Sequence, residues 1–177
     1  MLKELIKDKH TQAENTLFMQ KMFRGQLSED IWADFVFNKM MWYNAIEIKT
    51  KVEGHLEDLP GIERTYRLYQ DYKNSNKYSN KEFKKVSIDY FHYIMDLEPG
   101  KVLAHLYTWY MGDLSGGAVI KKLIKSPHTS LEFDNENQLR INILSKVDHS
   151  LIDEIHIAFD WAIKIMSEYD KEIINGH

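Results

Sequence analysis

The sequence predicts an all-α fold. Along most of the 177 residues, apolar side chains recur at intervals of three and four, the spacing of one helix face. Sustained alternation at an interval of two, which a half-buried strand would show, is missing, and proline and glycine divide the chain into about eight periodic stretches. Because no Gly/Ser-rich linker separates these stretches, we expect residues 1–177 to form a single multi-helical domain around one core.

Capping residues and proline place the first three helices. They are predicted over residues 1–23 with a break near Asn15, over residues 28–52, and over residues 60–72. Ser28 can accept a hydrogen bond from the first backbone N–H groups of the second helix and is its expected N-cap. Pro60 suits the first turn of the third helix, where no N–H donor is needed.

Polar and proline-containing segments separate the later helices. A loop is expected over residues 73–80 and an irregular connector over residues 126–137. Helices are predicted over residues 81–95, from Pro99-Gly100 to the connector, over residues 138–146, and over residues 150–168. Ser150 is the expected N-cap of the last helix.

The composition excludes several classes of function. A net charge of −4 and the lack of a basic stripe argue against nucleic-acid binding. The absence of cysteine removes disulfides, thiolate metal sites and cysteine nucleophiles, and is typical of a protein in a reducing cytoplasm. Early charges argue against a signal peptide, and no run approaches the roughly 20 apolar residues of a membrane anchor, so we expect a soluble cytoplasmic protein.

Three glycines interrupt the apolar helix that contains residues 105–117. Each glycine in a helix interior costs about 1 kcal/mol relative to alanine, so Gly112, Gly116 and Gly117 need an explanation. Gly116 and Gly117 lie three and four residues beyond Asp113, on its helical face, where a large flat ligand could approach the backbone. A close crossing of two helices is an equally good explanation from the spacing alone.

A histidine lies on the apolar face of the first helix. This face is formed by Leu2, Ile6, His10, Ala13 and Leu17. We therefore expect His10 to be buried, with Glu14 one turn on as a hydrogen-bond partner that leaves the second ring nitrogen available to a metal. A satisfied core histidine is the simpler alternative. No other histidine has the spacing of a two-ligand helix face, so a metal at His10 would arrive inside a cofactor.

Two segments of the chain resemble the haem oxygenase family, the biliverdin-producing enzymes. Residues 9–19, Lys-His-Thr-Gln-Ala-Glu-Asn-Thr-Leu-Phe-Met, are similar to its proximal-histidine segment, and residues 107–119, which contain Gly-Asp-Leu-Ser-Gly-Gly, are similar to its distal segment. A weaker similarity extends from Lys3 to Met166. The resemblance implies an all-α fold that holds haem between the proximal helix and a distal helix kinked at its glycines.

The resemblance also implies roles for residues at the centre of the site. His10 would be the axial ligand of the haem iron, and Glu14 would support it by a hydrogen bond. The three glycines of the distal helix would let its backbone lie against the porphyrin. Asp113 would organise a distal water network, which Tyr43 joins, and these two residues are the implied catalytic groups.

Further residues are implied at the periphery of the haem. The residues implied to contact the propionates are Lys3, Tyr107 and Arg140. Phe159 would form part of the haem wall, although ordinary core packing explains it as well. Trp109 departs from the family, since many members carry a basic residue there, and Glu136 replaces the propionate-binding lysine of animal members.

The implied reaction is the oxidation of haem b by O2 and an external electron donor to biliverdin, expected to be the IXα isomer, with CO and Fe2+. Haem is then both cofactor and substrate. Six lysines could form a basic rim for an acidic donor such as ferredoxin, although they could equally be a solvated face: Lys3, Lys7, Lys9, Lys121, Lys122 and Lys125. A flavoprotein reductase is the other expected donor, and a bilin reductase could act on the product.

Two other functions remain open on the same fold. A haem carrier or sensor would bind haem without degrading it, and Trp109 keeps this alternative open. A thiaminase-like hydrolase is disfavoured because such enzymes use a cysteine nucleophile, which this chain lacks.

Overall fold

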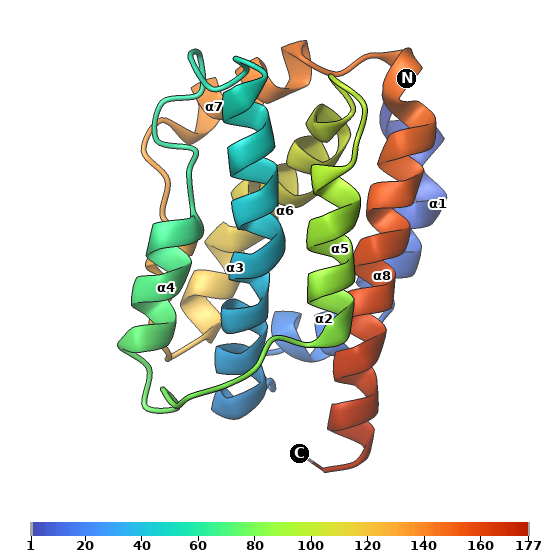
Figure 1. The fold of residues 1–177 in the computed structure, drawn as a ribbon. Helices are drawn as coiled ribbons and strands as arrows, with labels where there is room; N and C mark the ends of the chain where they lie inside the picture. The colour runs from blue at the N-terminus through green and yellow to red at the C-terminus, as the bar shows by residue number, and fades with distance from the viewer. Residues whose placement is uncertain (1, 177) are drawn as a thin grey trace.

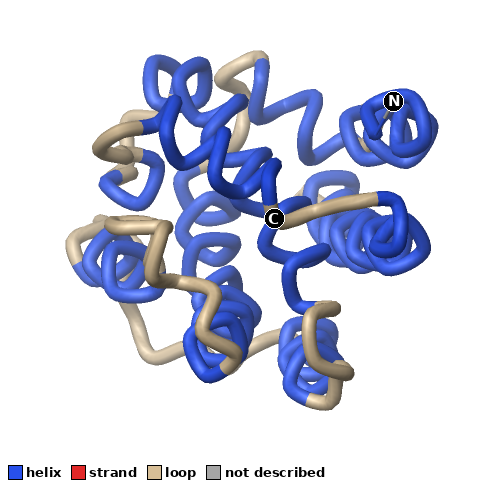
Figure 2. Tube along the Cα trace, turned by 90° about the horizontal axis from the view of Figure 1, so that it is seen from above, coloured by secondary structure: helices blue, strands red, loops and turns tan. Residues whose placement is uncertain are grey.

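The computed structural model describes residues 2–176, and this part of the chain is all helix and loop, without a strand (Figure 1, Figure 2). The all-α prediction is confirmed. The helices are α1 (Leu2–Glu14), α2 (Leu17–Phe23), α3 (Glu29–Val52), α4 (Thr65–Lys73), α5 (Lys85–Met95), α6 (Val102–Leu123), α7 (Glu136–Ser145) and α8 (Ile152–Ile174), with short 3-10 helices η1 (Thr129–Leu131) and η2 (His149–Leu151). No helix among these is both long and apolar enough to cross a membrane.

The long helices α3 and α6 form the centre of the bundle. Both bury side chains on most of their circumference, as expected of helices enclosed by others. Helices α4 and α5 pack on α3, while α2, α7 and α8 pack on α6, and α1 lies beside α8 (Figure 1). The core between them is rich in aromatic side chains, and those that are almost fully buried are Phe18, Trp42, Tyr43, Tyr90, Tyr110 and Tyr169.

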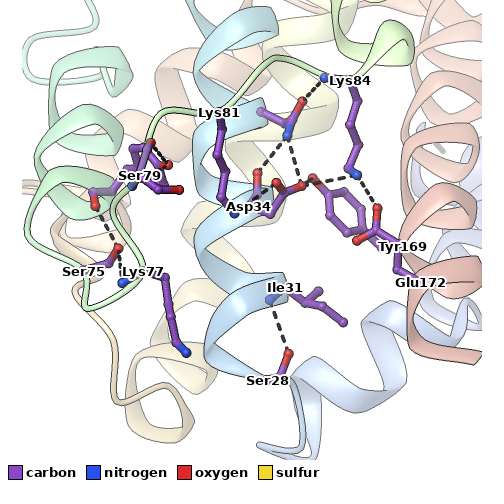
Figure 3. Close-up of polar contacts among 12 residues, drawn as sticks. Ser28, Ile31, Asp34, Ser75, Lys77, Ser79, Lys81, Lys84, Tyr169 and Glu172 are labelled. Atoms are coloured by element: carbon purple, nitrogen blue, oxygen red, sulfur yellow. Dashed lines mark hydrogen bonds and ion pairs between the residues drawn. The ribbon is translucent and has the colours of Figure 1, made fainter. Parts of the chain in front are cut away.

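A polar cluster joins α3 to α8 and to the segment before α5 (Figure 3). Asp34 on α3 accepts hydrogen bonds from the Tyr169 hydroxyl at 3.0 Å and from Asn38 Nδ2 at 3.1 Å. Its carboxylate also forms ion pairs with Lys81 at 3.3 Å and Lys84 at 3.4 Å. These contacts hold residues 81–84 outside the helix, so α5 begins at Lys85, four residues later than predicted.

The helix ends agree with the prediction where the cap is local in sequence. The break near Asn15 is present, and Thr16 caps α2 by accepting the N–H of Met19 at 3.3 Å. Ser28 caps α3 as expected, with its Oγ accepting the N–H of Ile31 at 3.3 Å (Figure 3). Residue 1, where the prediction began the first helix, lies outside the described residues.

Other helix ends differ because tertiary contacts decide them. Helix α4 begins at Thr65 and not at Pro60, because the Glu47 side chain accepts the backbone N–H groups of Arg64 and Thr65 there. Ser150 is not the N-cap of α8: it lies within η2, and its own N–H donates to Asp148 Oδ1 at 2.8 Å.

Two further boundaries lie beyond their predicted positions. Helix α7 begins at Glu136, so it takes in the last residues of the expected connector, and η1 lies inside that connector. Helix α8 continues to Ile174, six residues past the predicted end at Glu168, because Tyr169 is fully buried and Ile173 packs against the core.

Candidate functional site

A cavity of about 650 Å³ lies among α1, α2, α3, α6 and α8. This volume is within the range of pockets that hold small molecules and cofactors. Its walls are mostly apolar, and most of the polar side chains lie on α1 and α6, with Lys39 contributed by α3. Residues from the surrounding helices that line it include Lys3 and His10 of α1, Phe23 of α2, Phe35 and Lys39 of α3, and Phe159 of α8.

His10 lies on the α1 wall of this cavity. Its side chain is 54% exposed, so the prediction of a buried histidine was wrong: the apolar face of α1 turns toward an open cavity and not toward filled core. Nδ1 lies 3.5 Å from Glu14 Oε2, and the ring meets Phe159 edge-on with 6.1 Å between centroids. The Glu14 contact at Nδ1 orients the ring and leaves Nε2 as the nitrogen that can coordinate a metal.

The glycines of α6 have different surroundings. Gly112 lines the cavity, and a Cβ built there would meet no atom within 4 Å, so the backbone is open to a ligand. Gly116 also lines the cavity, beside the Phe23 ring. Gly117 does not line it: a Cβ there would lie 3.6 Å from Leu131, where η1 packs on α6. Helix α6 stays α-helical across all three, so the expected kink is not a break in the helix.

Asp113 faces the cavity from the same helix and accepts hydrogen bonds from two residues of α3. The Tyr43 hydroxyl donates to Oδ2 at 2.6 Å, and Lys39 Nζ donates to Oδ1 at 2.7 Å and to Oδ2 at 3.0 Å. Tyr43 is fully buried and does not line the cavity, so in this structure it reaches the cavity only through its hydrogen bond to Asp113. Burial, with the charge of Asp113 as a second cause, raises the pKa of Tyr43 well above its usual value, which keeps the hydroxyl protonated as a donor.

Sequence reasoning missed Lys39. It lies one turn before Tyr43, so both side chains reach α6 from the same face of α3. The available signal was a lone lysine within Phe35-Val36-Phe37-Asn38-Lys39-Met40-Met41-Trp42-Tyr43, a stretch too apolar to be a solvated face. Its partner could not be read from the sequence, because Asp113 is 74 residues away.

The residues predicted to contact acidic groups of a ligand divide into two sets. Lys3 and Tyr107 line the cavity, and so does Lys7 of the predicted basic rim. Arg140 does not line it: its guanidinium donates to the Leu114 carbonyl of α6 and lies 3.6 Å from Glu136, so its contact with a propionate stays a prediction. Arg140 lies on α7 where that helix packs on α6, and its side chain is 33% exposed.

Trp109 lines the cavity, but its N–H group is bonded to a residue other than Asp113. Its indole Nε1–H donates to the Tyr90 hydroxyl at 3.0 Å. Tyr90 in turn lies 2.7 Å from His105 Nδ1, and His105 Nε2 lies 3.0 Å from Glu154 Oε1. Because the Glu154 carboxylate can only accept, His105 carries its proton on Nε2 and accepts at Nδ1 from Tyr90. Trp109 therefore belongs to a buried hydrogen-bonded chain behind the cavity.

The sequence of the whole domain matches the profile of a known protein family. The profile described as "Heme oxygenase" matches residues 1–167. The chain belongs to the haem oxygenase family. It is 29% identical to heme oxygenase 2 of Rattus norvegicus over 97% of this chain and 65% of that protein, and 25% identical to heme oxygenase of Rhodella violacea over 93% of this chain and 83% of that one. The chain thus spans about two thirds of the length of the mammalian relatives.

Solved structures of haem oxygenases share the fold. Heme oxygenase-1 of the cyanobacterium Synechocystis, in complex with heme, superposes with a TM-score of 0.84 at 25% identity, covering 98% of this chain and 92% of that chain. Heme oxygenase of Leptospira interrogans superposes with a TM-score of 0.80 at 22% identity, covering 94% and 97%.

The residues around the cavity fit an iron porphyrin. His10 on one wall offers one nitrogen ligand, and Gly112 on the α6 wall leaves room for a flat molecule. Within residues 2–176, no group of three or more His, Asp or Glu side chains is arranged to hold a metal ion. Lys3 and Lys7, both exposed at the cavity, offer cations to carboxylates of such a ligand.

Proposed function

We propose that this protein binds haem b between α1 and α6 and oxidises it with O2 and reducing equivalents to biliverdin, CO and Fe2+. The observation that carries the proposal is one apolar cavity with His10 on one wall and Asp113 beside Gly112 on another. Haem supplies both the iron that activates O2 and the macrocycle that is cleaved. Membership of the haem oxygenase family and the heme-bound cyanobacterial structure support the same substrate.

On the proximal wall, the function of His10 is to hold the iron as a neutral imidazole. Glu14 orients the ring through Nδ1, and Phe159 restricts it from the side. A neutral ligand donates less electron density than a thiolate, which disfavours early O–O cleavage and suits a reaction in which oxygen must reach the porphyrin.

On the distal wall, Asp113 would order water and thereby direct protons. Its carboxylate can only accept hydrogen bonds, so it fixes the orientation of water molecules that donate to it. Tyr43 and Lys39 fix the carboxylate itself. Gly112, which adds no side chain, lets the helix backbone restrict the space for oxygen, and we expect this to favour the α-meso edge and the IXα isomer.

The electron donor in this proposal is a ferredoxin, with a flavoprotein reductase as the alternative, and a bilin reductase could take up the product in the cytoplasm. Lys3 and Lys7 are exposed at the cavity, where an acidic protein could dock close to the haem edge. Two of the other predicted rim lysines contact acids: Lys9 pairs with Asp160, and Lys121 lies 3.9 Å from Glu136. The rim is therefore weaker than the six lysines predicted.

Turnover with spectroscopy tests the proposal. The purified protein, given one equivalent of haem, reduced ferredoxin and O2, is expected to lose the Soret band and gain bilin absorption, with the biliverdin isomer identified by chromatography. A haem carrier or sensor would keep its Soret band under the same conditions. That result would reject the enzyme and leave the alternative function.

Substitution of His10 tests the proximal side. H10A is expected to remain folded, because the side chain is exposed, and to lose the spectrum of histidine-ligated haem together with turnover. H92A is the matched control, since His92 is exposed on α5 and does not line the cavity. If H10A keeps the parent's haem spectrum, the assignment of the proximal ligand is wrong.

A further inference from the structure

Lys39 and Asp113 form an ion pair at the wall of the cavity. Lys39 Nζ lies 2.7 Å and 3.0 Å from the two carboxylate oxygens, and the side chains are only 5% and 12% exposed. With the Tyr43 hydroxyl on Oδ2, three donor contacts fix the carboxylate from the α3 side. Both Lys39 and Asp113 line the cavity, so the pair borders the space that a ligand would occupy.

The position of the ammonium group is itself constrained. Nζ lies 4.7 Å from the centroid of the Tyr43 ring and 5.7 Å from that of Phe35, so aromatic faces support the charge on the sides that Asp113 does not cover. Trp109, one turn before Asp113 on α6, cannot take this role, because its only polar atom donates to Tyr90.

The other charged and titratable groups around Asp113 are engaged elsewhere. Tyr110 of α6 donates to Glu47 of α3 at 2.7 Å, and Arg64, before α4, donates to backbone carbonyl groups including that of Glu132. On α1, His10 contacts Glu14. Lys39 is thus the cation in direct contact with Asp113 among residues 2–176.

We propose that Lys39 is the positioning residue that keeps Asp113 ionised and fixed in orientation at the distal wall. This inference rests on the proposed haem oxygenase function, in which Asp113 orders water as a hydrogen-bond acceptor. A carboxylate on an apolar wall is stable only if it is paired, and without the ammonium its neutral form is favoured. A protonated carboxyl would become a donor, which reverses one of the hydrogen bonds that orient the water.

The absence of cysteine allows a sharp test. In K39C the new thiol is the only one in the chain, so it can be alkylated in denaturant and the protein then refolded. Aminoethylation rebuilds a side chain with an ammonium at nearly the length of lysine, whereas carbamidomethylation gives a neutral side chain of similar size. The parent protein, taken through the same steps, shows that the reagents and refolding have no other effect.

The first measurement uses the protein without haem. Infrared spectra near neutral pH are expected to show the carbonyl band of a protonated carboxylic acid in the carbamidomethylated protein and not in the aminoethylated one. The band is assigned to Asp113 by its loss when D113N is added to the same K39C background. A role for Lys39 confined to packing would not move this band.

The second measurement is turnover of the haem-loaded proteins. The neutral form is expected to bind haem but to produce biliverdin at least about tenfold more slowly near pH 7, whereas the aminoethylated form is expected to recover the parent's rate. K49M is a matched control, since Lys49 is a partly buried lysine of α3 that bonds carbonyl groups away from the cavity.

The outcomes are distinguishable. An ionised Asp113 and a turnover rate within about twofold of the parent in the neutral form would overturn the proposal. If K39C does not refold, K39M and K39R, expressed directly, replace the neutral and charged forms in both measurements. If the parent itself makes no biliverdin, the proposed function fails, while the infrared result still decides whether Lys39 keeps Asp113 ionised.

Discussion

At the scale of single residues, Asp113 has two functions, one at the proposed site and one in stability. It must stay in place beside a large ligand, and it is the acid that neutralises the buried Lys39 ammonium. Removing one member of a buried pair leaves the other charge uncompensated, which costs about 3–5 kcal/mol in other proteins. Changes at Asp113 therefore affect both stability and the proposed chemistry, and the two effects need to be separated.

Asparagine and alanine at position 113 separate them. D113N keeps an oxygen that can accept from Lys39 or Tyr43, so it is expected to unfold at a higher temperature than D113A. Both variants should bind haem with nearly the parent's affinity, because Asp113 does not ligate iron, yet give sharply less biliverdin. Without ordered proton delivery the oxidation takes other routes, and peroxidase-like activity with hydrogen peroxide should rise. Thermal unfolding, haem titration and product analysis measure the three effects.

A D113A protein that forms biliverdin at the parent's rate and yield would contradict the distal part of the proposed mechanism. The chain would then be a haem-binding helical protein in which the carboxylate has a structural function only. The comparison with D113N guards against misreading a poorly folded alanine variant as a catalytic defect.

A site residue could be predicted from the sequence where its position on a helix face determines whether it lines the cavity. His10 and Asp113 were assigned to helix faces by spacing, and both line the cavity. What lies opposite a face was not predictable, because it depends on contacts between distant segments. For this reason the sequence did not reveal that Lys39 contacts Asp113, that Tyr43 is fully buried, or that Arg140 bonds the Leu114 carbonyl.

At the scale of the element, α6 uses its glycines for two different purposes. Gly112 faces open cavity, whereas Gly117 faces Leu131 of η1. The two explanations left open by the sequence, a ligand approach and a close packing contact, therefore both apply, each at a different glycine.

Alanine substitutions should distinguish these purposes. In G112A the new methyl group meets no protein atom, so the protein without haem should gain about 0.5–1 kcal/mol, or roughly 1–4 °C in Tm, from better helix propensity. The same methyl group enters the space for the ligand, so haem affinity should fall or the biliverdin isomer ratio should change. G117A, whose Cβ makes an ordinary 3.6 Å contact with Leu131, should leave both haem properties unchanged.

Calorimetry of the protein without haem and a haem titration test this pair. Equal haem affinity and isomer ratio in G112A, G117A and the parent would show that the α6 backbone does not contact the ligand at position 112.

Helix boundaries show the same division between local and distant causes. Ser28 and Thr16 cap helices through atoms three residues away, and the sequence reveals the Ser28 cap directly. The start of α4 is fixed by Glu47, which lies 17 residues before Arg64, so no local pattern could place it. The all-α class could be predicted because the spacing of apolar residues is a local property of the sequence. Helix ends that are set by hydrogen bonds to distant residues could not be predicted.

At the scale of the whole molecule, the net charge is −4, but positive side chains lie at the cavity. Lys3 and Lys7 are exposed at the cavity of an otherwise acidic protein, and an acidic donor would be attracted there. With haem saturating, since both lysines also face the ligand's carboxylates, K3Q/K7Q is expected to raise the KM for ferredoxin several-fold with little change in kcat, and the parent's rate should fall as ionic strength rises to the physiological range. K171Q, at an exposed lysine near the end of α8, is the control. A salt-independent rate would count against the docking surface.

The buried chain behind the cavity should govern the stability of the whole molecule in mild acid. His105 is fully buried between Tyr90 and Glu154, and burial lowers the pKa of its imidazole below the usual 6.5, although Glu154 opposes the shift. The unfolded chain then binds a proton that the folded protein does not, so the free energy of unfolding should fall as pH drops below 6.5. The pKa of Glu154 is also lowered, because hydrogen bonds from His105 and Tyr93 outweigh its burial, so its contribution is lost only below its usual 4.5.

Between pH 4.5 and 6.5, the difference between a His105 variant and the parent isolates His105, because burial also raises the pKa of Glu47 above its usual 4.5 and Glu47 is present in both proteins. H105Q is expected to be less stable than the parent at pH 7.5, because it loses the paired contacts to Tyr90 and Glu154, but its stability should change less across this window. H92Q, at an exposed histidine of α5, should keep the parent's slope. Urea unfolding at a series of pH values gives the comparison. If H105Q loses stability in parallel with the parent between pH 6.5 and 4.5, another group is responsible for the acid sensitivity, since a residue without an ionisable ring cannot supply it.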